Sequence, residues 1–164
     1  MDPQLADLSM RVGTTLSRRR LLLGTAESCT GGWIAKLVTD VPGSSGWFEC
    51  GLVTYSNAAK QSLLGVRAET LETHGAVSET TAREMAEGVL ARTRADISVA
   101  VSGIAGPGGG SPDKPVGTVC LAWATRGGPV WAETVYLEGE REAVRRQAAV
   151  LALEGVLTYA GGER

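Results

Sequence analysis

The stretch from residue 24 to residue 32, Gly-Thr-Ala-Glu-Ser-Cys-Thr-Gly-Gly, constrains the fold more than any other part of the sequence. A short apolar run at residues 21–23 precedes it, and apolar residues at helical spacing follow it over residues 33–38. This order predicts a strand, a tight turn and a helix, with Ser28 between the end of the strand and the start of the helix. Such units build a sheet with helices packed against it.

The turn itself has two interpretations. The first backbone N–H groups of a helix lack intrahelical partners and favour negative charge, so Ser28 could be a nucleophile beside an oxyanion site. Gly31 and Gly32 would let a substrate approach this backbone closely. Alternatively, Ser28 or Thr30 caps the helix and the glycines only form the turn. The turn alone does not separate the two interpretations.

The composition is that of a single globular domain. The chain has 164 residues, of which 43% are hydrophobic, so residues 1–164 can bury one ordinary core. A formal net charge of −2 argues against binding to nucleic acid, and the basic cluster at residues 18–20 is predicted to end a helix. No apolar stretch approaches the roughly 18 residues of a membrane span, and no signal peptide opens the chain. Cys29, Cys50 and Cys120 lack metal-ligand spacing and predict free thiols in the cytoplasm.

Alternating helical and extended patterns predict the rest of the fold. Helices are expected over residues 3–19, 33–39, 68–74 and about 140–159. Two more are expected: a short helix that carries Asn57 and Lys60 and ends at Gly65, and a helix that begins after Ser78 as its cap. Strands are expected over residues 21–26, 47–55, 97–101, 118–125 and 130–137, the last two as a hairpin. This order predicts an α/β fold, a three-layer α/β/α sandwich on a mixed sheet. Ligands bind such sheets beyond the carboxyl ends of strands.

A hydroxyl nucleophile needs a base, and the sequence offers few. The single histidine, His74, precedes Gly75 at a predicted helix C-terminus, where a capping role is the simpler interpretation. Only three of the 16 Lys and Arg residues are lysines. A lysine in a cleft can give up its proton near neutral pH and an arginine cannot, so Lys60 is the candidate base. The alternative is an ordinary surface lysine on a short helix.

The glycine-rich segment at residues 103–110 follows a buried strand. It is not a P-loop, because no Gly-Lys-Ser/Thr closes it, and it lacks the last glycine of a dinucleotide fingerprint. Its exposed N–H groups could hold an anion such as a phosphate. A plain flexible loop is the alternative.

Six blocks of sequence together resemble one known family. They are Glu27-Ser28-Cys29-Thr30-Gly31-Gly32, Pro42-Gly43-Ser44-Ser45, Val53-Thr54-Tyr55-Ser56-Asn57-x-x-Lys60, Gly75-Ala76-Val77-Ser78, Met85-Ala86 and Gly103-Ile104-Ala105-Gly106-Pro107-Gly108-Gly109. Their order is similar to that in CinA C-terminal domains, from about Leu5 to Tyr159. The resemblance is to the free-standing form, which lacks the molybdopterin-binding-like domain of longer CinA proteins.

The resemblance implies an amidohydrolase of pyridine nucleotide salvage. Its substrate is nicotinamide mononucleotide, its products are nicotinate mononucleotide and ammonia, and it uses no metal or other cofactor. Ser28 would be the nucleophile, Lys60 the general base and Tyr55 a hydroxyl that relays or positions the proton. The N–H groups from Thr30 through Gly31 to Gly32 would hold the oxyanion.

The resemblance also implies a seat for the substrate's ribose phosphate in the glycine-rich loop. The residues concerned are Gly103, Gly106, Gly108 and Gly109, aided by Arg141 or Arg145 of the last helix. Ser102 departs from the family, which usually has Thr at this point. The hydroxyl is retained, so we expect a modest effect.

Two rival interpretations remain open. Cys29 could replace Ser28 as the nucleophile, although no basic partner is evident beside it. The chain could instead be a nucleotide-binding or protein-partner module connected with competence or DNA damage, as the family name suggests. A homo-oligomer, most simply a dimer, is also expected, with exposed Trp33, Trp47 or Trp131 as contacts.

Overall fold

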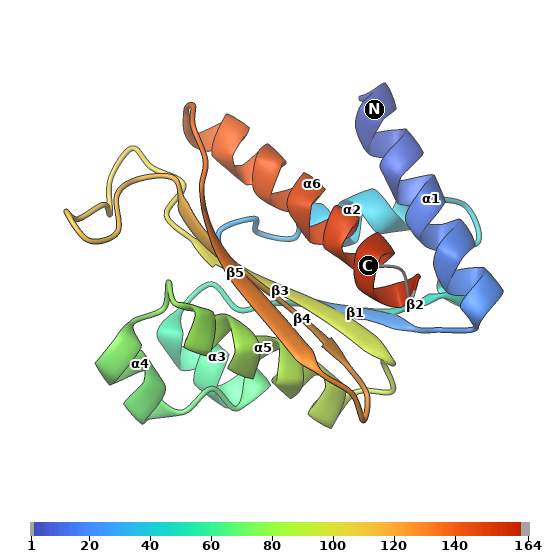
Figure 1. Cartoon of the computed structure of the whole chain (residues 1–164), viewed down its shortest axis with the longest axis horizontal. Coiled ribbons are helices and arrows are strands. Elements are labelled where there is room, and N and C mark those ends of the chain that lie inside the picture. The colour runs from blue at the N-terminus through green and yellow to red at the C-terminus, as the bar shows by residue number, and fades with distance from the viewer. Residues whose placement is uncertain (1, 162–164) are drawn as a thin grey trace.

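The computed structural model describes residues 2–161 and consists of three layers (Figure 1). The middle layer is a five-stranded sheet with strand order β2-β1-β3-β4-β5. Its strands are β1 (Leu23–Glu27), β2 (Phe48–Val53), β3 (Ile97–Gly103), β4 (Thr118–Thr125) and β5 (Val130–Tyr136). Strands β2, β1 and β3 run parallel, whereas β4 and β5 are antiparallel and form the predicted hairpin. The predicted three-layer α/β/α sandwich with a mixed sheet is confirmed.

Helices cover both faces of the sheet (Figure 1). One face carries α1 (Pro3–Arg19), α2 (Trp33–Thr39) and α6 (Arg141–Ala160), and the other carries α3 (Asn57–Leu64), α4 (Ala68–His74) and α5 (Glu79–Arg92). Local signals set most of these ends. Asp2 accepts a hydrogen bond from the N–H of Gln4, and Ser56 and Ser78 cap α3 and α5 in the same way. Helix α1 ends at the cluster of residues 18–20, as predicted, and Arg20 follows it in the left-handed region.

Two predicted strands are shorter in the structure. Strand β1 begins at Leu23 because the N–H of Leu21 still donates to the carbonyl of Leu16 and so belongs to the end of α1. Strand β2 begins at Phe48 because the N–H of Trp47 closes a 3₁₀ turn, η1 (Ser44–Gly46). In both cases the backbone N–H that could pair in a longer strand donates to a local carbonyl instead.

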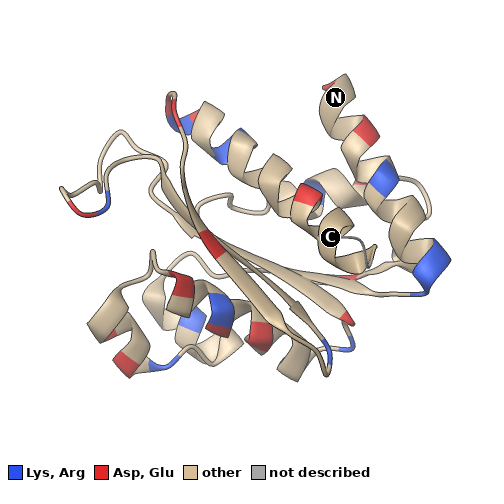
Figure 2. Cartoon of the chain, in the orientation of Figure 1, with Lys and Arg blue, Asp and Glu red and all other residues tan. Residues whose placement is uncertain are grey.

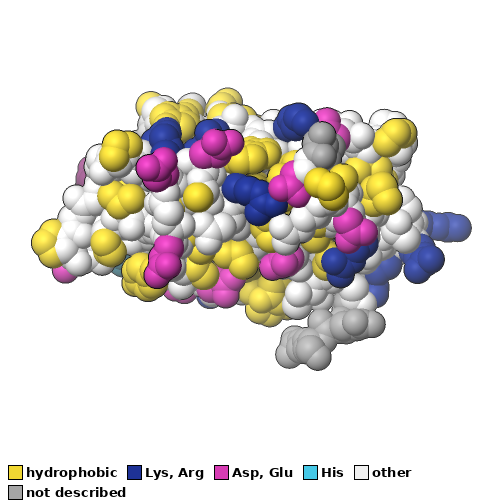
Figure 3. All heavy atoms as spheres, turned by 90° about the horizontal axis from the view of Figure 1, so that it is seen from above, with side chains coloured by type: hydrophobic (Ala, Val, Ile, Leu, Met, Phe, Trp, Pro, Cys, Tyr) yellow, Lys and Arg dark blue, Asp and Glu magenta, His cyan; other side chains and the backbone are white. Residues whose placement is uncertain are grey.

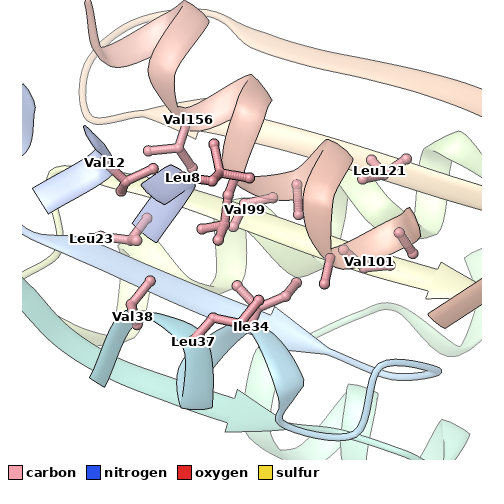
Figure 4. Packing of buried hydrophobic residues seen from close by; sticks show 14 of the residues in the cluster. Leu8, Val12, Leu23, Ile34, Leu37, Val38, Val99, Val101, Leu121 and Val156 are labelled. Atoms are coloured by element: carbon pink, nitrogen blue, oxygen red, sulfur yellow. The ribbon is translucent and has the colours of Figure 1, made fainter. Parts of the chain in front are cut away.

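The core between the sheet and the α1, α2 and α6 layer is built from branched aliphatic residues. Figure 4 shows Leu8 and Val12 of α1 and Val156 of α6 beside Val99 of β3, with Leu37 of α2 in the same cluster. All five side chains are buried. The helices of this layer therefore hold the sheet from one side, and a second cluster under α5 holds it from the other.

The prediction of exposed tryptophans is wrong. Trp47 is only 3% exposed, and its ring lies so close to Gly13 that a Cβ there would come within 2.8 Å of it. Trp131 stacks on Tyr159 with 4.0 Å between ring centroids. Trp33 is half-buried under the guanidinium of Arg145. These rings are used within the chain, so the expected dimer remains a prediction without an aromatic contact to support it.

The charged side chains are dispersed. Lys, Arg, Asp and Glu lie on both helical layers (Figure 2), and the face seen from above mixes both signs (Figure 3). No helix within residues 2–161 is long and apolar enough to cross a membrane.

The sheet topology directs attention to the end of β1. This strand lies between β2 and β3. The chain leaves β1 through α2 on one face of the sheet, and it leaves the neighbouring β2 through α3, α4 and α5 on the other. The connections therefore diverge at the carboxyl ends of β1 and β2, which is where open α/β sheets form their ligand crevices. Ser28 is the first residue beyond that end.

Candidate active site

Ser28 and Lys60 form a buried pair at the end of β1. The N–H of Ser28 donates to the carbonyl of Val101 at 2.9 Å, which ties the nucleophile turn to β3. Lys60 comes from α3 on the opposite layer, and its Nζ lies 2.9 Å from Ser28 Oγ. The side chains are 8% and 1% exposed. The structure thus brings together two residues that lie 32 positions apart in the sequence.

The surroundings of Lys60 favour its neutral form. Burial lowers the pKa of its amine below the ordinary value of 10.5, and a nearby Cys29 only partly opposes this. None of the ion pairs within residues 2–161 includes Lys60. Its Nζ also contacts the carbonyls of Thr54 (2.9 Å) and Tyr55 (3.5 Å). A neutral amine can donate to these two carbonyls and keep its lone pair for the Ser28 hydroxyl.

Glu27 is a buried carboxylate that the sequence interpretation missed. It is fully buried, and its two oxygens accept hydrogen bonds from the N–H groups of Ile34 (2.9 Å) and Ala35 (3.0 Å). Glu27 therefore supplies the anion at the N-terminus of α2 and does not pair with Lys60. An acidic residue near a helix N-terminus is a known sequence signal. Glu27 was not selected because it lies several positions before the start of α2 in the sequence.

The predicted oxyanion site at the turn is only partly available. The N–H of Gly31 donates to the carbonyl of Ser28 at 3.0 Å. The N–H groups of Thr30 and Gly32 have no hydrogen bond to any residue of the described chain. None of Thr30, Gly31 and Gly32 lines the pocket beside Ser28. The helix start therefore does not contact the pocket in the way the sequence predicts.

A pocket of about 270 Å³ opens over the Ser28–Lys60 pair. Ser102, which is 1% exposed, lines it from the end of β3, beside Ser28. The full lining consists of Ser28, Cys29, Tyr55, Asn57, Lys60, Ala76, Val77, Ser102, Gly103, Ile104, Ala105, Gly106, Gly108, Gly109 and Arg141. The three loops predicted to surround the site therefore do meet, and Asn57, Ala76 and Val77 are lining residues that sequence reasoning did not select.

The two candidate arginines of α6 have different positions. Arg141 lines the pocket, and its guanidinium donates to the carbonyl of Gly106 at 2.8 Å. Arg145 lies outside the lining and donates to the carbonyls of Cys29 (3.0 Å) and Thr30 (3.2 Å). Arg145 therefore holds the turn that follows Ser28, whereas Arg141 lines the pocket where a ligand would bind.

Tyr55 lies at the mouth of the pocket. Tyr55 is 62% exposed, and its hydroxyl accepts a hydrogen bond from Arg141 at 3.1 Å. Within the described residues this hydroxyl makes no hydrogen bond to Ser28 or Lys60. The predicted proton relay through Tyr55 is therefore not part of this geometry.

The glycine-rich loop after β3 presents its backbone to the pocket. Gly106 and Gly109 adopt φ values of 88° and 89°, which favour glycine. The N–H groups of Gly106, Gly108 and Gly109 make no hydrogen bond within the chain as described. The loop thus offers the unpaired donors that an anion needs.

His74 lies outside the pocket, at the end of α4.

Cys29 is next to the nucleophile position and lines the same pocket. Burial is the main reason that the pKa of its thiol is raised to about 11. A thiol with so high a pKa is almost entirely protonated at neutral pH, and the thiolate is the reactive form. Ser28 Oγ, by contrast, lies 2.9 Å from the buried amine of Lys60, whose pKa is lowered.

Comparison with known proteins identifies the family of the chain. The family model of the CinA C-terminal domain matches residues 5–160. The chain is 56% identical to the nicotinamide-nucleotide amidohydrolase PncC of Escherichia coli K12, over 93% of each chain. It is 59% identical to a putative competence-damage inducible protein of Symbiobacterium thermophilum, but spans only 38% of that longer protein.

Solved structures agree as well. The crystal structure of the competence/damage inducible protein CihA from Agrobacterium tumefaciens superposes with a TM-score of 0.93 at 46% identity, covering 96% of each chain. The match of sequence and fold extends over both layers of helices and all the loops around the pocket. The chain belongs to the CinA C-terminal domain family.

Proposed function

We propose that this chain is a nicotinamide-nucleotide amidohydrolase, which converts nicotinamide mononucleotide and water to nicotinate mononucleotide and ammonia. The observation that carries the proposal is the contact of 2.9 Å between Ser28 Oγ and a buried Lys60 Nζ at the base of a pocket. The activity for which the Escherichia coli relative is named supports it. Such a reaction belongs to pyridine nucleotide salvage in the cytoplasm, a compartment that suits the free thiols of Cys29, Cys50 and Cys120.

The pair would act through an acyl-enzyme. Neutral Lys60 takes the proton of Ser28 Oγ as this oxygen attacks the carboxamide carbon. Lys60 then gives the proton to the nitrogen, the C–N bond breaks and ammonia leaves. Water, deprotonated by Lys60, attacks the ester carbon, and the proton returns to Ser28 as the acid is released. The N–H of Cys29 would donate to the oxyanion, because Cys29 follows Ser28 and lines the same pocket.

The mouth of the pocket would hold the phosphate of the nucleotide. Arg141 lies there with the unpaired N–H groups of Gly108 and Gly109, and guanidinium and backbone donors both suit a phosphate. Tyr55 keeps a hydroxyl hydrogen to donate, because its oxygen accepts from Arg141. We therefore assign Tyr55 to substrate positioning in place of proton relay.

The direct test is ammonia release from nicotinamide mononucleotide by the purified protein, with and without a chelator such as EDTA. We expect turnover at the same rate in both cases, because each proton transfer is assigned to Ser28 and Lys60. Binding of the nucleotide by calorimetry without any ammonia would contradict the amidase and favour a binding module. A rate that depends on added metal would contradict the mechanism.

The proposal also predicts the pH dependence of the reaction. Protonated Lys60 cannot accept the Ser28 proton, so kcat/KM should rise with pH through the pKa of Lys60 and level off above it. Burial places this pKa below 10.5. In the unfolded chain Lys60 binds its proton more tightly, so the contribution of Lys60 to the free energy of unfolding should rise with pH from the lowered pKa up to about 10.5, while the raised pKa of Cys29 acts in the opposite direction above about 9. Rate profiles, and urea titrations of the wild type against Lys60→Met, measure both. A kcat/KM that does not change with pH on the acid side would contradict the role of Lys60.

A further inference from the structure

The hydrogen-bond acceptors around the Ser28–Lys60 pair are mostly in use. The carbonyl of Ser28 accepts from Gly31, and the carbonyl of Cys29 accepts from Arg145. The carbonyls of residues 54 and 55, just beyond the end of β2, both accept from Lys60 Nζ. Among the side chains that line the pocket, free acceptors are few. A primary carboxamide brings two N–H hydrogens that need acceptors when it leaves water.

Two side-chain oxygens in the lining remain for this purpose. Ser28 Oγ is the attacking atom, and Tyr55 Oη is held by Arg141. The remaining candidates are the hydroxyl of Ser102, on β3, and the amide of Asn57, on α3. Asn57 makes no side-chain hydrogen bond within residues 2–161, and its Oδ1 is an acceptor only.

Ser102 is buried beside Ser28 and Asn57 is exposed, but only Asn57 shares a helix with Lys60. Asn57 is the first residue of α3 and lies three positions before Lys60, so the two side chains emerge from neighbouring points of one helix and line one pocket. The leaving nitrogen must turn toward Lys60 to receive its proton. An acceptor on the same helix is therefore on the side of the pocket where the amide hydrogens come to lie.

We propose that Asn57 is a specificity-determining residue, whose Oδ1 accepts a hydrogen bond from the NH₂ group of the substrate carboxamide and orients the leaving nitrogen toward Lys60. This inference rests on the proposed amidase function. It implies that the site distinguishes a primary amide from an ester or a ketone of the same shape, because those groups give Asn57 no hydrogen to accept.

The test compares three nucleotides that differ only in this group. They are nicotinamide mononucleotide, the methyl ester of nicotinate mononucleotide as an alternative substrate, and 3-acetylpyridine mononucleotide as an inhibitor that is not hydrolysed. For Asn57→Ala we expect kcat/KM for the amide to fall about tenfold, the size of one lost neutral hydrogen bond. The kcat/KM for the ester and the inhibition constant of the ketone should change by less than about twofold.

Gln61→Ala is the matched control, because Gln61 is an exposed amide on the same helix outside the pocket lining. It should leave all three measurements unchanged. Equal losses for amide and ester in Asn57→Ala, weaker binding of the ketone, or an unchanged rate with the amide would each overturn the inference. Those results require an active wild type. A wild type that releases no ammonia contradicts the proposed function itself, and the role of Asn57 with it.

Discussion

Replacement of Lys60 with arginine is expected to lower kcat/KM for nicotinamide mononucleotide by about 1,000-fold. Arginine keeps the positive charge and can still donate to the carbonyl of Thr54. It cannot release its proton at any pH at which the protein is folded, so the base is lost. A pure binding site would tolerate this change, because charge and hydrogen bonding are preserved. The effect on turnover therefore separates an amidase from a nucleotide-binding module.

The experiment needs controls for folding, because Lys60 is 1% exposed and a guanidinium is larger than an amine. Lys60→Met is the second variant, since methionine is uncharged and flexible enough to fill the same space. Both variants should lose activity, while calorimetry with the nucleotide and circular dichroism report binding and fold. Lys36→Arg is the matched control, because Lys36 is an exposed lysine of α2 that pairs with Asp40. A Lys60→Arg enzyme within about tenfold of the wild type would contradict the role of Lys60 as the base.

The fold could be predicted from the sequence because its signals are local. The bounds of α1, α2 and α4 follow from Pro3, from the turn glycines and from Gly75, each of which acts within a few residues of its own position. The proposed catalytic pair is non-local, and the family resemblance together with the chemistry of lysine predicted it. The structure adds the contact of 2.9 Å between Ser28 Oγ and Lys60 Nζ.

The features that could not be predicted all depend on three-dimensional neighbours. Trp47 was expected at the surface, but it fills the space left by Gly13, which no sequence pattern connects to it. Glu27 takes the N–H groups of α2 only because the turn folds its side chain back onto the helix. The roles of Arg141 and Arg145 differ by one turn of α6, and only the placement of that helix decides which of them reaches the pocket.

Replacement of Ser28 with alanine is expected to have the largest effect of any single change, a loss of kcat/KM of at least about 10,000-fold. Without Oγ no acyl-enzyme can form, and the remaining groups can only bind the nucleotide and polarise its carboxamide. The fold should be unaffected, because the N–H of residue 28 still reaches Val101 and Lys60 keeps its bonds to two carbonyls. Nucleotide affinity in the variant, measured by calorimetry, should therefore stay close to that of the wild type.

The neighbouring cysteine makes this test decisive. Cys29→Ala removes the alternative nucleophile, whose buried thiol has a pKa of about 11, and should leave kcat/KM within about threefold of the wild type. Rapid quenching followed by mass spectrometry should find the nicotinoyl nucleotide attached to Ser28 in the wild type and in Cys29→Ala, and no adduct in Ser28→Ala. If activity and adduct persist in Ser28→Ala but vanish in Cys29→Ala, the nucleophile is the thiol. Lys60 would then be the group that lowers the pKa of that thiol when substrate binds.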